Sequence, residues 1–368
     1  MPTEQTALSD KIIYDPRPTV EVDGERNQML QQLLTGMEVR AQEGGLSSAE
    51  LRFRNTATLE DVGNDYAFEG SENELLSLGK SITVYTGDRN TPQEIFRGTI
   101  TGLEFINQPP QQPELVVLAE DDLLKARMSR KTRLFSDSTA GDVIETIGQE
   151  LGLNVSVEGL DETLDDWLQH NETDLAFMRR LLARFDGDMQ MLEGELLVAP
   201  RSDIQRGEFS LRMRSQLLSV RLCADLNHQV TGVSLSHWDP AQGERIEAES
   251  DQAADMGPGE GTRGDEALEQ ALDERNEHLS GVAAANQSEA QAVVNAAFSR
   301  RARRFVTLNG IAIGNPSLKV GSHVSLQGVG PRFENSYYLT RVLHRYDRSD
   351  RQYQTEFEGE CGFFGPGE

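Results

Sequence analysis

Residues 318–361 read LKVGSHVSLQGVGPRFENSYYLTRVLHRYDRSDRQYQTEFEGEC, and three strand signals follow one another in this stretch. The clearest is at its end, where Tyr353, Thr355 and Phe357 alternate with polar residues, so that one face is predicted to be buried and the other wet. Residues 320–326 alternate in the same way, and residues 337–346 are apolar on both faces. Turn-forming Gly, Pro, Asn, Asp and Ser residues separate the three. The stretch therefore predicts an antiparallel meander of the kind that closes a small barrel.

Short strand signals also fill residues 12–119. Strands are predicted at 12–22, 37–39, 49–53, 80–86, 95–105 and 115–119, with a turn at Asp23-Gly24 and a bulge or bend at Gly102. The run 115–119 is apolar throughout, which predicts burial on both faces. Short strands divided by turns favour a barrel over a parallel sheet.

The hydrophobic period becomes helical after residue 135. Residues 138–142 (STAGD) resemble a capping box, and the helix they begin is predicted to stop at Gly152. A second helix is predicted from about residue 172 to Gly187, followed by a hairpin over 189–198. Beyond it, strands at 217–224 and 229–237 are expected to open a second barrel. Residues 240–264 read as an acidic linker or exposed loop, and residues 265–279 and 289–304 as amphipathic helices.

Composition limits the classes of function. The chain has 368 residues, which is too long for one ordinary core, so two or more domains are expected. Its hydrophobic content of 37% is low and indicates burial between subunits, and its net charge is -26. The acidic balance argues against nucleic-acid-specific binding, and two cysteines do not suggest a disulfide framework or a zinc site. No signal peptide or membrane span is apparent, which favours assembly in the cytoplasm. Residues 236–295 are acidic and residues 296–353 are basic. These segments are interpreted either as solvated faces of different domains or as complementary patches that meet across a subunit interface.

Four segments carry a family resemblance. These are 18–24, 96–104, DLAFMRRLLARFDGDMQMLEGELLVAP over 174–200, and the closing meander with its pattern vGs.V.L.GvG.rf...Yyl.rv.H.yd....Y.TeFe. Together they resemble the phage late control D proteins, the tail hubs of contractile phage tails, which are similar to the hub portion of type VI secretion spike proteins.

The resemblance implies a mainly β fold with an α/β insert (α+β), in which two small antiparallel β-barrels of similar topology flank a small α/β domain. The predicted organisation is a disordered N-terminal tail at 1–10, a first barrel at 11–130, the α/β domain at 131–205, a second barrel at 206–240 and 300–362, an acidic loop and helical insertion at 241–299, and a C-terminal tail at 363–368.

The implied function is a structural hub of a contractile tail or injection system. A homotrimer would present six barrels, adapting the sixfold tail tube to the threefold spike and lining the channel. The implied partners are the spike, tail tube, baseplate wedge and tape measure proteins, with assembly in the cytoplasm before incorporation into the particle. Phage, tailocin and extracellular injection system all stay open. The spike is expected to be a separate protein, because residues 362–368 have no repeat and no room for another domain.

Two sets of residues are interface candidates. Arg300, Arg301, Arg303 and Arg304 form a basic cluster that either ends a helix, where cations are favoured, or contacts an acidic partner. Phe363 and Phe364 are costly to leave in water, so they are expected to dock on their own chain or on the spike base.

No catalytic, cofactor-binding or metal-binding residues are predicted, and the chain is not expected to be an enzyme. Asp161, Glu162, Asp165 and Asp166 are interpreted as a solvated acidic turn, with a carboxylate active site as the weaker hypothesis. His344 is expected to hydrogen-bond a neighbouring strand. The alternative function is a peptidoglycan-binding or wall-degrading accessory module, because residues 139–155 faintly resemble a LysM-type helix.

Overall fold

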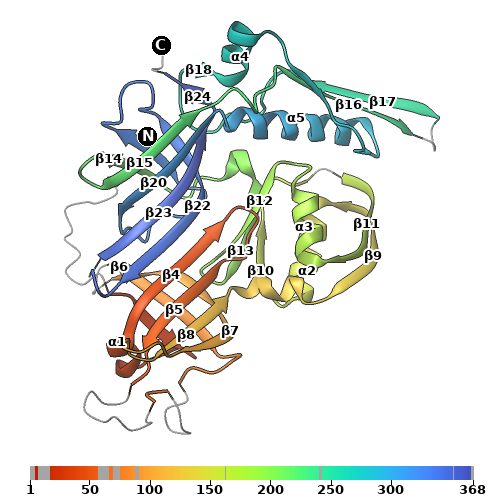
Figure 1. Cartoon of the computed structure of the whole chain (residues 1–368). Coiled ribbons are helices and arrows are strands. Elements are labelled where there is room, and N and C mark those ends of the chain that lie inside the picture. The colour runs from red at the N-terminus through yellow and green to blue at the C-terminus, as the bar shows by residue number, and fades with distance from the viewer. Residues whose placement is uncertain are drawn as a thin grey trace.

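The computed structural model describes residues 5–6, 17–56, 66–68, 75–87, 91–161, 163–239, 243–350 and 352–365. The predicted mainly β fold is confirmed, with antiparallel sheets predominating and few helices. A 14-stranded sheet runs through the molecule, with a small α/β module on one side and a helix-bearing insertion across one end (Figure 1). The predicted disordered tail at 1–10 falls largely outside the described residues, within which β1 (Gln5–Thr6) pairs with β14.

The first β region surrounds one apolar core. Its strands pair in the order β4-β5-β8-β7-β6-β2-β3, and the short helix α1 (Gln28–Leu33) precedes β4. Their bounds are β2 Thr19–Val22, β3 Glu25–Arg26, β4 Leu34–Gln42, β5 Ser48–Arg54, β6 Ser81–Gly87, β7 Pro92–Ile106 and β8 Glu114–Glu120. The predicted irregularity at Gly102 is confirmed as a register shift between β7 and β8. Burial throughout 115–119 is wrong, because β8 buries Val117 and Ala119 while Leu118 points outward and is exposed.

The second β region contains the predicted meander. Strand β21 (His323–Gln327) pairs with β22 (Ser336–Asp347), which pairs with β23 (Gln352–Cys361), all antiparallel. The predicted inward residues Tyr353, Thr355 and Phe357 are buried. Strands β14 (Glu208–Arg212), β15 (Leu217–Ala224) and β20 (Val306–Ile313) complete the region.

The two β regions share a connection order. In the first, the pairing path is β4-β5-β8-β7-β6, and in the second it is β15-β20-β23-β22-β21. Each path consists of a strand pair, then a strand that skips two neighbours in sequence, then two hairpins. The last neighbour differs, because β2 is antiparallel to β6 whereas β14 is parallel to β21. Closure of each region into a barrel stays a prediction.

The α/β module has its own core and lies beside the first region. Helix α2 (Ala140–Glu150) begins at the predicted capping box, in which the Asp142 amide donates to the Thr139 hydroxyl and the Thr139 amide donates to the Asp142 carboxylate. Helix α3 (Asp174–Leu182) and the sheet β10-β13-β12 pack against it. The remaining elements are η1 Asp122–Arg127, β9 Arg130–Thr139, β10 Asn154–Val157, β11 Thr163–Thr173, β12 Gly187–Leu192, β13 Glu195–Pro200 and η2 Arg201–Asp203.

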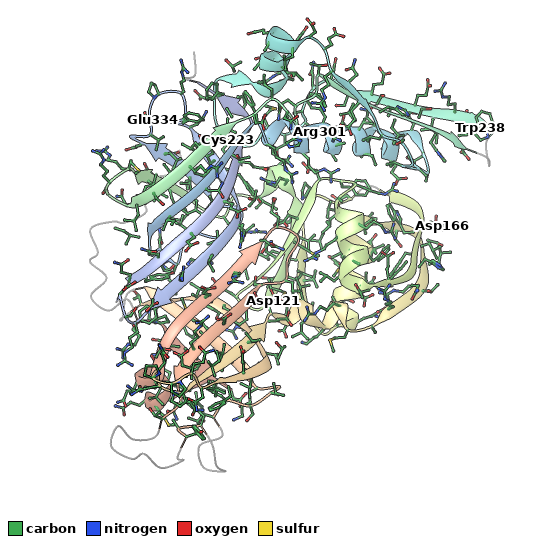
Figure 2. All side chains as sticks on the ribbon, viewed as in Figure 1. Asp121, Asp166, Cys223, Trp238, Arg301 and Glu334 are labelled. Carbon is green, nitrogen blue, oxygen red and sulfur yellow. The ribbon has the colours of Figure 1, made fainter. Side chains whose placement is uncertain are left out.

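The insertion between β15 and β20 departs from the sequence prediction in three respects. The helix predicted over 265–279 ends at Leu272, and residues 276–278 form a strand instead. Strand β16 (Gly232–Asp239) was expected in the second barrel, but it pairs with β17 (Glu244–Ser250) and β19 (Asn276–His278) in a separate sheet covered by α5 (Gln287–Arg303). The expected acidic loop 240–264 includes all of β17 and also β18 (Thr262–Arg263), ahead of α4 (Gly264–Leu272). The β16–β17 ribbon projects from the body, with the exposed Trp238 near its tip (Figure 2). Among the described residues, none of the helices combines the length and apolarity that crossing a membrane requires.

Candidate assembly surfaces

The two β regions are joined edge to edge. Strand β22 of the second region pairs antiparallel with β4 of the first, from Arg341 opposite Gln42 to Asp347 opposite Gly36. Tyr346 and Tyr353 reach across the joint into the core of the first region. A strand pair of seven residues with shared apolar packing makes the two regions one continuous body.

His344 lies buried on β22 at this joint. Its Nδ1 is 2.9 Å from the Tyr353 hydroxyl and 3.3 Å from the Thr355 hydroxyl, both on β23. The predicted hydrogen bond to a neighbouring strand is therefore confirmed. Burial lowers the pKa of His344 to about 4, so the imidazole is neutral at physiological pH.

A cluster of charged side chains lies where four parts of the chain meet. Arg201 of η2 contacts Glu43 beyond β4 at 2.6 Å and Glu360 of β23 at 2.9 Å. Its guanidinium also lies 3.3 Å from the centre of the Tyr338 ring, a cation–π contact. Because Arg201 is buried, the attraction of these partners offsets the desolvation free energy of its charge.

Arg303 of α5 enters the same cluster from the insertion. Its two terminal nitrogens bind both carboxylate oxygens of Asp186 at 2.6 and 2.7 Å, and Asp255 lies at 3.0 Å. Glu360 is 3.4 Å from its Nε. The cluster thus links the α/β module, the insertion and both β regions, and its Arg303–Asp186 pair has the planar, bidentate geometry that suits arginine.

Burial also changes the acid–base behaviour of this cluster. Desolvation raises the pKa of Glu43 to about 7 against the opposing attraction of Arg201, and the nearby Glu360 and Asp188 carboxylates add to the rise. Burial likewise raises the pKa of Asp188, although that carboxylate accepts a 2.6 Å hydrogen bond from the Gly44 amide. Perturbed carboxylates of this kind occur at catalytic sites and in structural ion networks alike.

The structure gives the predicted interface residues different environments. Arg303 is buried within the chain, Arg301 pairs with Glu277, and Arg300 is partly buried with a pKa lowered by desolvation. Arg304 is the exposed member of this basic cluster, and contact with a partner stays a prediction. Phe363 and Phe364 form β24, which pairs with β18 on their own chain, and Phe364 packs edge-on against Phe305 and Phe333.

Of the expected acidic turn, Asp165 and Asp166 instead lie in strand β11, which pairs with β9, while Asp161 precedes the strand and Glu162 lies outside the described residues. Asp166 is exposed at the outer side of the α/β module (Figure 2). Within the part of the chain that the structure describes, His, Cys, Asp and Glu side chains do not gather in a group that could hold a metal ion.

Large apolar side chains on the edges of the sheet are features that the sequence analysis did not single out. Leu103 and Phe105 of β7, Leu78 before β6 and Leu218 of β15 are all exposed. Strand β7 buries Phe96 and Ile100, but sequence alone could not show that Leu103 and Phe105 beyond Gly102 are exposed. Exposed apolar residues along unpaired strand edges typically mark a protein–protein contact.

The family described as the Alg8 N-terminal domain matches residues 18–347. The chain belongs to this family. No curated protein matches the sequence.

Solved structures share the fold over nearly the whole chain. The 43 kDa tail protein of prophage MuSo2 from Shewanella oneidensis superposes with a TM-score of 0.68 at 11% identity, covering 93% of this chain and 97% of that one. A tail protein from Neisseria meningitidis MC58 gives 0.64 at 13% identity, covering 95% and 97%. An Escherichia coli type VI secretion component, described as similar to T4 bacteriophage tail proteins gp27 and gp5, gives 0.58 at 14%, covering 95% and 79%. The fold is therefore that of phage tail and type VI secretion proteins.

Proposed function

We propose that this protein is the hub of a contractile phage tail or a related injection system, of the late control D type. In this role three copies assemble into a symmetry adaptor, with a sixfold tail tube on one side and a threefold spike on the other. The role is mechanical, and no catalytic step is assigned to the chain.

The observation that carries the proposal is the pair of β regions with one connection order, in a fold shared with phage tail proteins over 93% of the chain. Three copies of a chain with two similar regions supply six similar units, which a sixfold tube can match. The edge-to-edge joint between β4 and β22 shows how such units can adjoin.

The charge cluster supports a mechanical role. Arg201 and Arg303 fasten four parts of the chain to one another, and their partners lie 117 and 159 positions apart in sequence for Asp186–Arg303 and Arg201–Glu360. A body fastened in this way can transmit force between a tube and a spike without separating.

The test is co-expression of the full chain with the tail tube and spike proteins encoded by neighbouring genes, followed by affinity purification and electron microscopy. The expected result is a particle with three copies of this chain, bound to both partners. A hub that binds neither partner, or an assembled particle with two or six copies, would overturn the proposal.

A matched pair of variants asks whether the exposed part of the basic cluster takes part. Arg304→Glu reverses an exposed charge and is expected to weaken one partner contact, whereas Arg275→Glu changes a second insertion arginine outside the cluster. Sedimentation with purified peptidoglycan sacculi tests the wall-binding alternative. Specific pelleting of the chain without tube or spike binding would favour that alternative.

A further inference from the structure

The two β regions correspond residue by residue. A register shift interrupts β4–β5 at Thr35, and another interrupts β15–β20 at Leu218. A shift also interrupts β7–β8 at Thr101 and β22–β23 at Thr340. When Thr35 is aligned with Leu218, the pairing of β5 with β8 and of β20 with β23 also brings Thr101 into alignment with Thr340. The same alignment places β4 on β15 and β7 on β22.

A matching turn supports this alignment. The Gly79 amide donates to the Ile100 carbonyl at 2.9 Å, and the Gly321 amide donates to the Leu339 carbonyl at 2.8 Å. Both glycines have a positive φ, +86° and +88°, which favours glycine at this position. The shared irregularities indicate that the two regions are copies of one unit.

The joint within the chain uses only half of the edges that this unit offers. Strand β4 of the first region meets β22 of the second. By the alignment, the unused counterparts are β15, which takes the place of β4, and β7, which takes the place of β22. Among the described residues, Ser219–Ala224 of β15 pair only with β20, while Leu217 also forms a single bridge with Met213, and residues 101–106 of β7 pair only with β8.

Side-chain exposure differs between the two copies in the way that a missing neighbour predicts. On the used edge, Val320, Val342 and His344 are 3%, 1% and 6% exposed. Their counterparts on the unused edge are Leu78, Leu103 and Phe105, which are 64%, 39% and 49% exposed. The same positions of one unit are therefore buried where β4 and the β12–β13 hairpin lie beside them, and largely exposed in the first region, where Tyr66 is the aromatic neighbour of Phe105.

We propose that residues 101–106 of β7 in one copy of this chain pair with β15 of a second copy, in the antiparallel register that joins β22 to β4. Leu103 then lies opposite Ala224, Glu104 opposite Cys223, and Phe105 opposite Leu222. This inference rests on the proposed self-assembly and names the strands that meet.

Hydrogen bonding fits this pairing. Glu104, opposite Cys223, becomes the diagonal neighbour of Arg221 on one side and of Asp225 on the other, and all three are exposed in the single chain. Within the chain the Glu43 amide donates to the Thr340 carbonyl at 3.0 Å, and the counterpart between copies runs from the Leu226 amide to the Thr101 carbonyl. Repeating one edge contact from copy to copy is a heterologous contact, which gives a ring of three when each contact rotates the next copy by one third of a turn.

The exposed native Cys223 provides a test (Figure 2). Directly opposed residues of an antiparallel pair have Cα atoms roughly 4.5–5.5 Å apart, within the range that a disulfide spans. In Glu104→Cys, the new thiol and Cys223 of the next copy are oxidised to a disulfide by added oxidised glutathione, which is reduced to two molecules of glutathione. The expected product on a non-reducing gel is a ladder of covalent oligomers that ends at three copies.

Two controls fix the register. Glu104→Cys combined with Cys223→Ser is expected to give no ladder. Arg97→Cys lies on the same strand where β6 already occupies the edge, and is also expected to give none. If Glu104→Cys does not fold, the pair Ile106→Cys with Arg221→Cys in a Cys223→Ser background tests the same register two residues along.

A folded variant that gives no crosslink, or an Arg97→Cys variant that crosslinks equally, would overturn the strand pairing. Tube and spike binding without crosslinking would remove this inference and leave the proposed function. Crosslinking without binding to either partner would leave the strand pairing and remove the proposed function.

Discussion

Replacing Arg303 with Met removes the cation that faces three carboxylates. Arg303 is 2% exposed, binds Asp186 through two nitrogens and lies 3.0 Å from Asp255. Methionine fills a similar volume but leaves these carboxylates uncompensated. Removing one partner of a buried ion pair costs about 3–5 kcal/mol. At roughly 1.3 °C for each kcal/mol in a body of this size, the melting temperature should fall by about 4–6 °C.

The assay is thermal unfolding followed by circular dichroism and by fluorescence of Trp167, which is buried in the α/β module that Asp186 adjoins. Arg304→Met is the matched control, because that neighbouring side chain is 66% exposed and its nearest carboxylate contact is 3.8 Å long. Surface pairs of this kind contribute only about 0–1 kcal/mol. The Arg303→Met and Asp186→Asn double variant should lose less than the sum of the two single changes, because both remove one interaction.

Equal melting temperatures for Arg303→Met and Arg304→Met would refute this reasoning. Additive losses in the double variant would show that Arg303 and Asp186 act separately, and the cluster would then not fasten the modules together.

Three further outcomes are expected. Phe357→Asp should prevent folding, because burying a carboxylate in the core of the second β region costs several kcal/mol. Glu356→Gln on the outer face should leave the urea midpoint nearly unchanged. Protonation of His344 should lower the free energy of unfolding by about 3 kcal/mol between pH 6.5 and 4, because the imidazole takes up a proton in the unfolded chain but stays neutral in the folded one. Urea titrations at the two pH values should show a smaller decline for His344→Gln. Thr139→Ala should cost about 1 kcal/mol by removing the cap of α2, whereas Thr139→Ser should cost little, measured by thermal unfolding of the α/β module.

Local chemistry made part of the fold predictable from sequence. Alternation over Tyr353–Phe357 and the capping box at Thr139 depend on neighbours a few residues away, and both are confirmed. Strand β16 was placed in the wrong sheet because its alternation shows that one face is buried but not which sheet buries it. Leu118 was misjudged because an uninterrupted apolar run does not reveal which of its residues face out.

The candidate surfaces were less predictable because they depend on distant residues. The arginine cluster was visible, but the burial of Arg303 depends on Asp186, which lies 117 positions away. The joint of β4 with β22 connects strands about 300 residues apart. An alternating pattern predicts a strand, but which strand pairs with its edge depends on the tertiary structure of the whole sheet.

The charge cluster and the repeated β unit have one structural explanation. The turn at 43–47 between β4 and β5 corresponds to the insertion between β15 and β20, because those strands correspond. Arg179 of α3 donates to the Gly44 and Gly45 carbonyls at 2.7 and 3.0 Å, which fixes the short turn on the α/β module. Arg303, at the end of the long insertion, reaches Asp186 of the same module. The two equivalent connections of the similar regions thus converge on one module, so the perturbed carboxylates there follow from fastening the fold, and the edges of β7 and β15 are the surfaces that we propose for contact between copies.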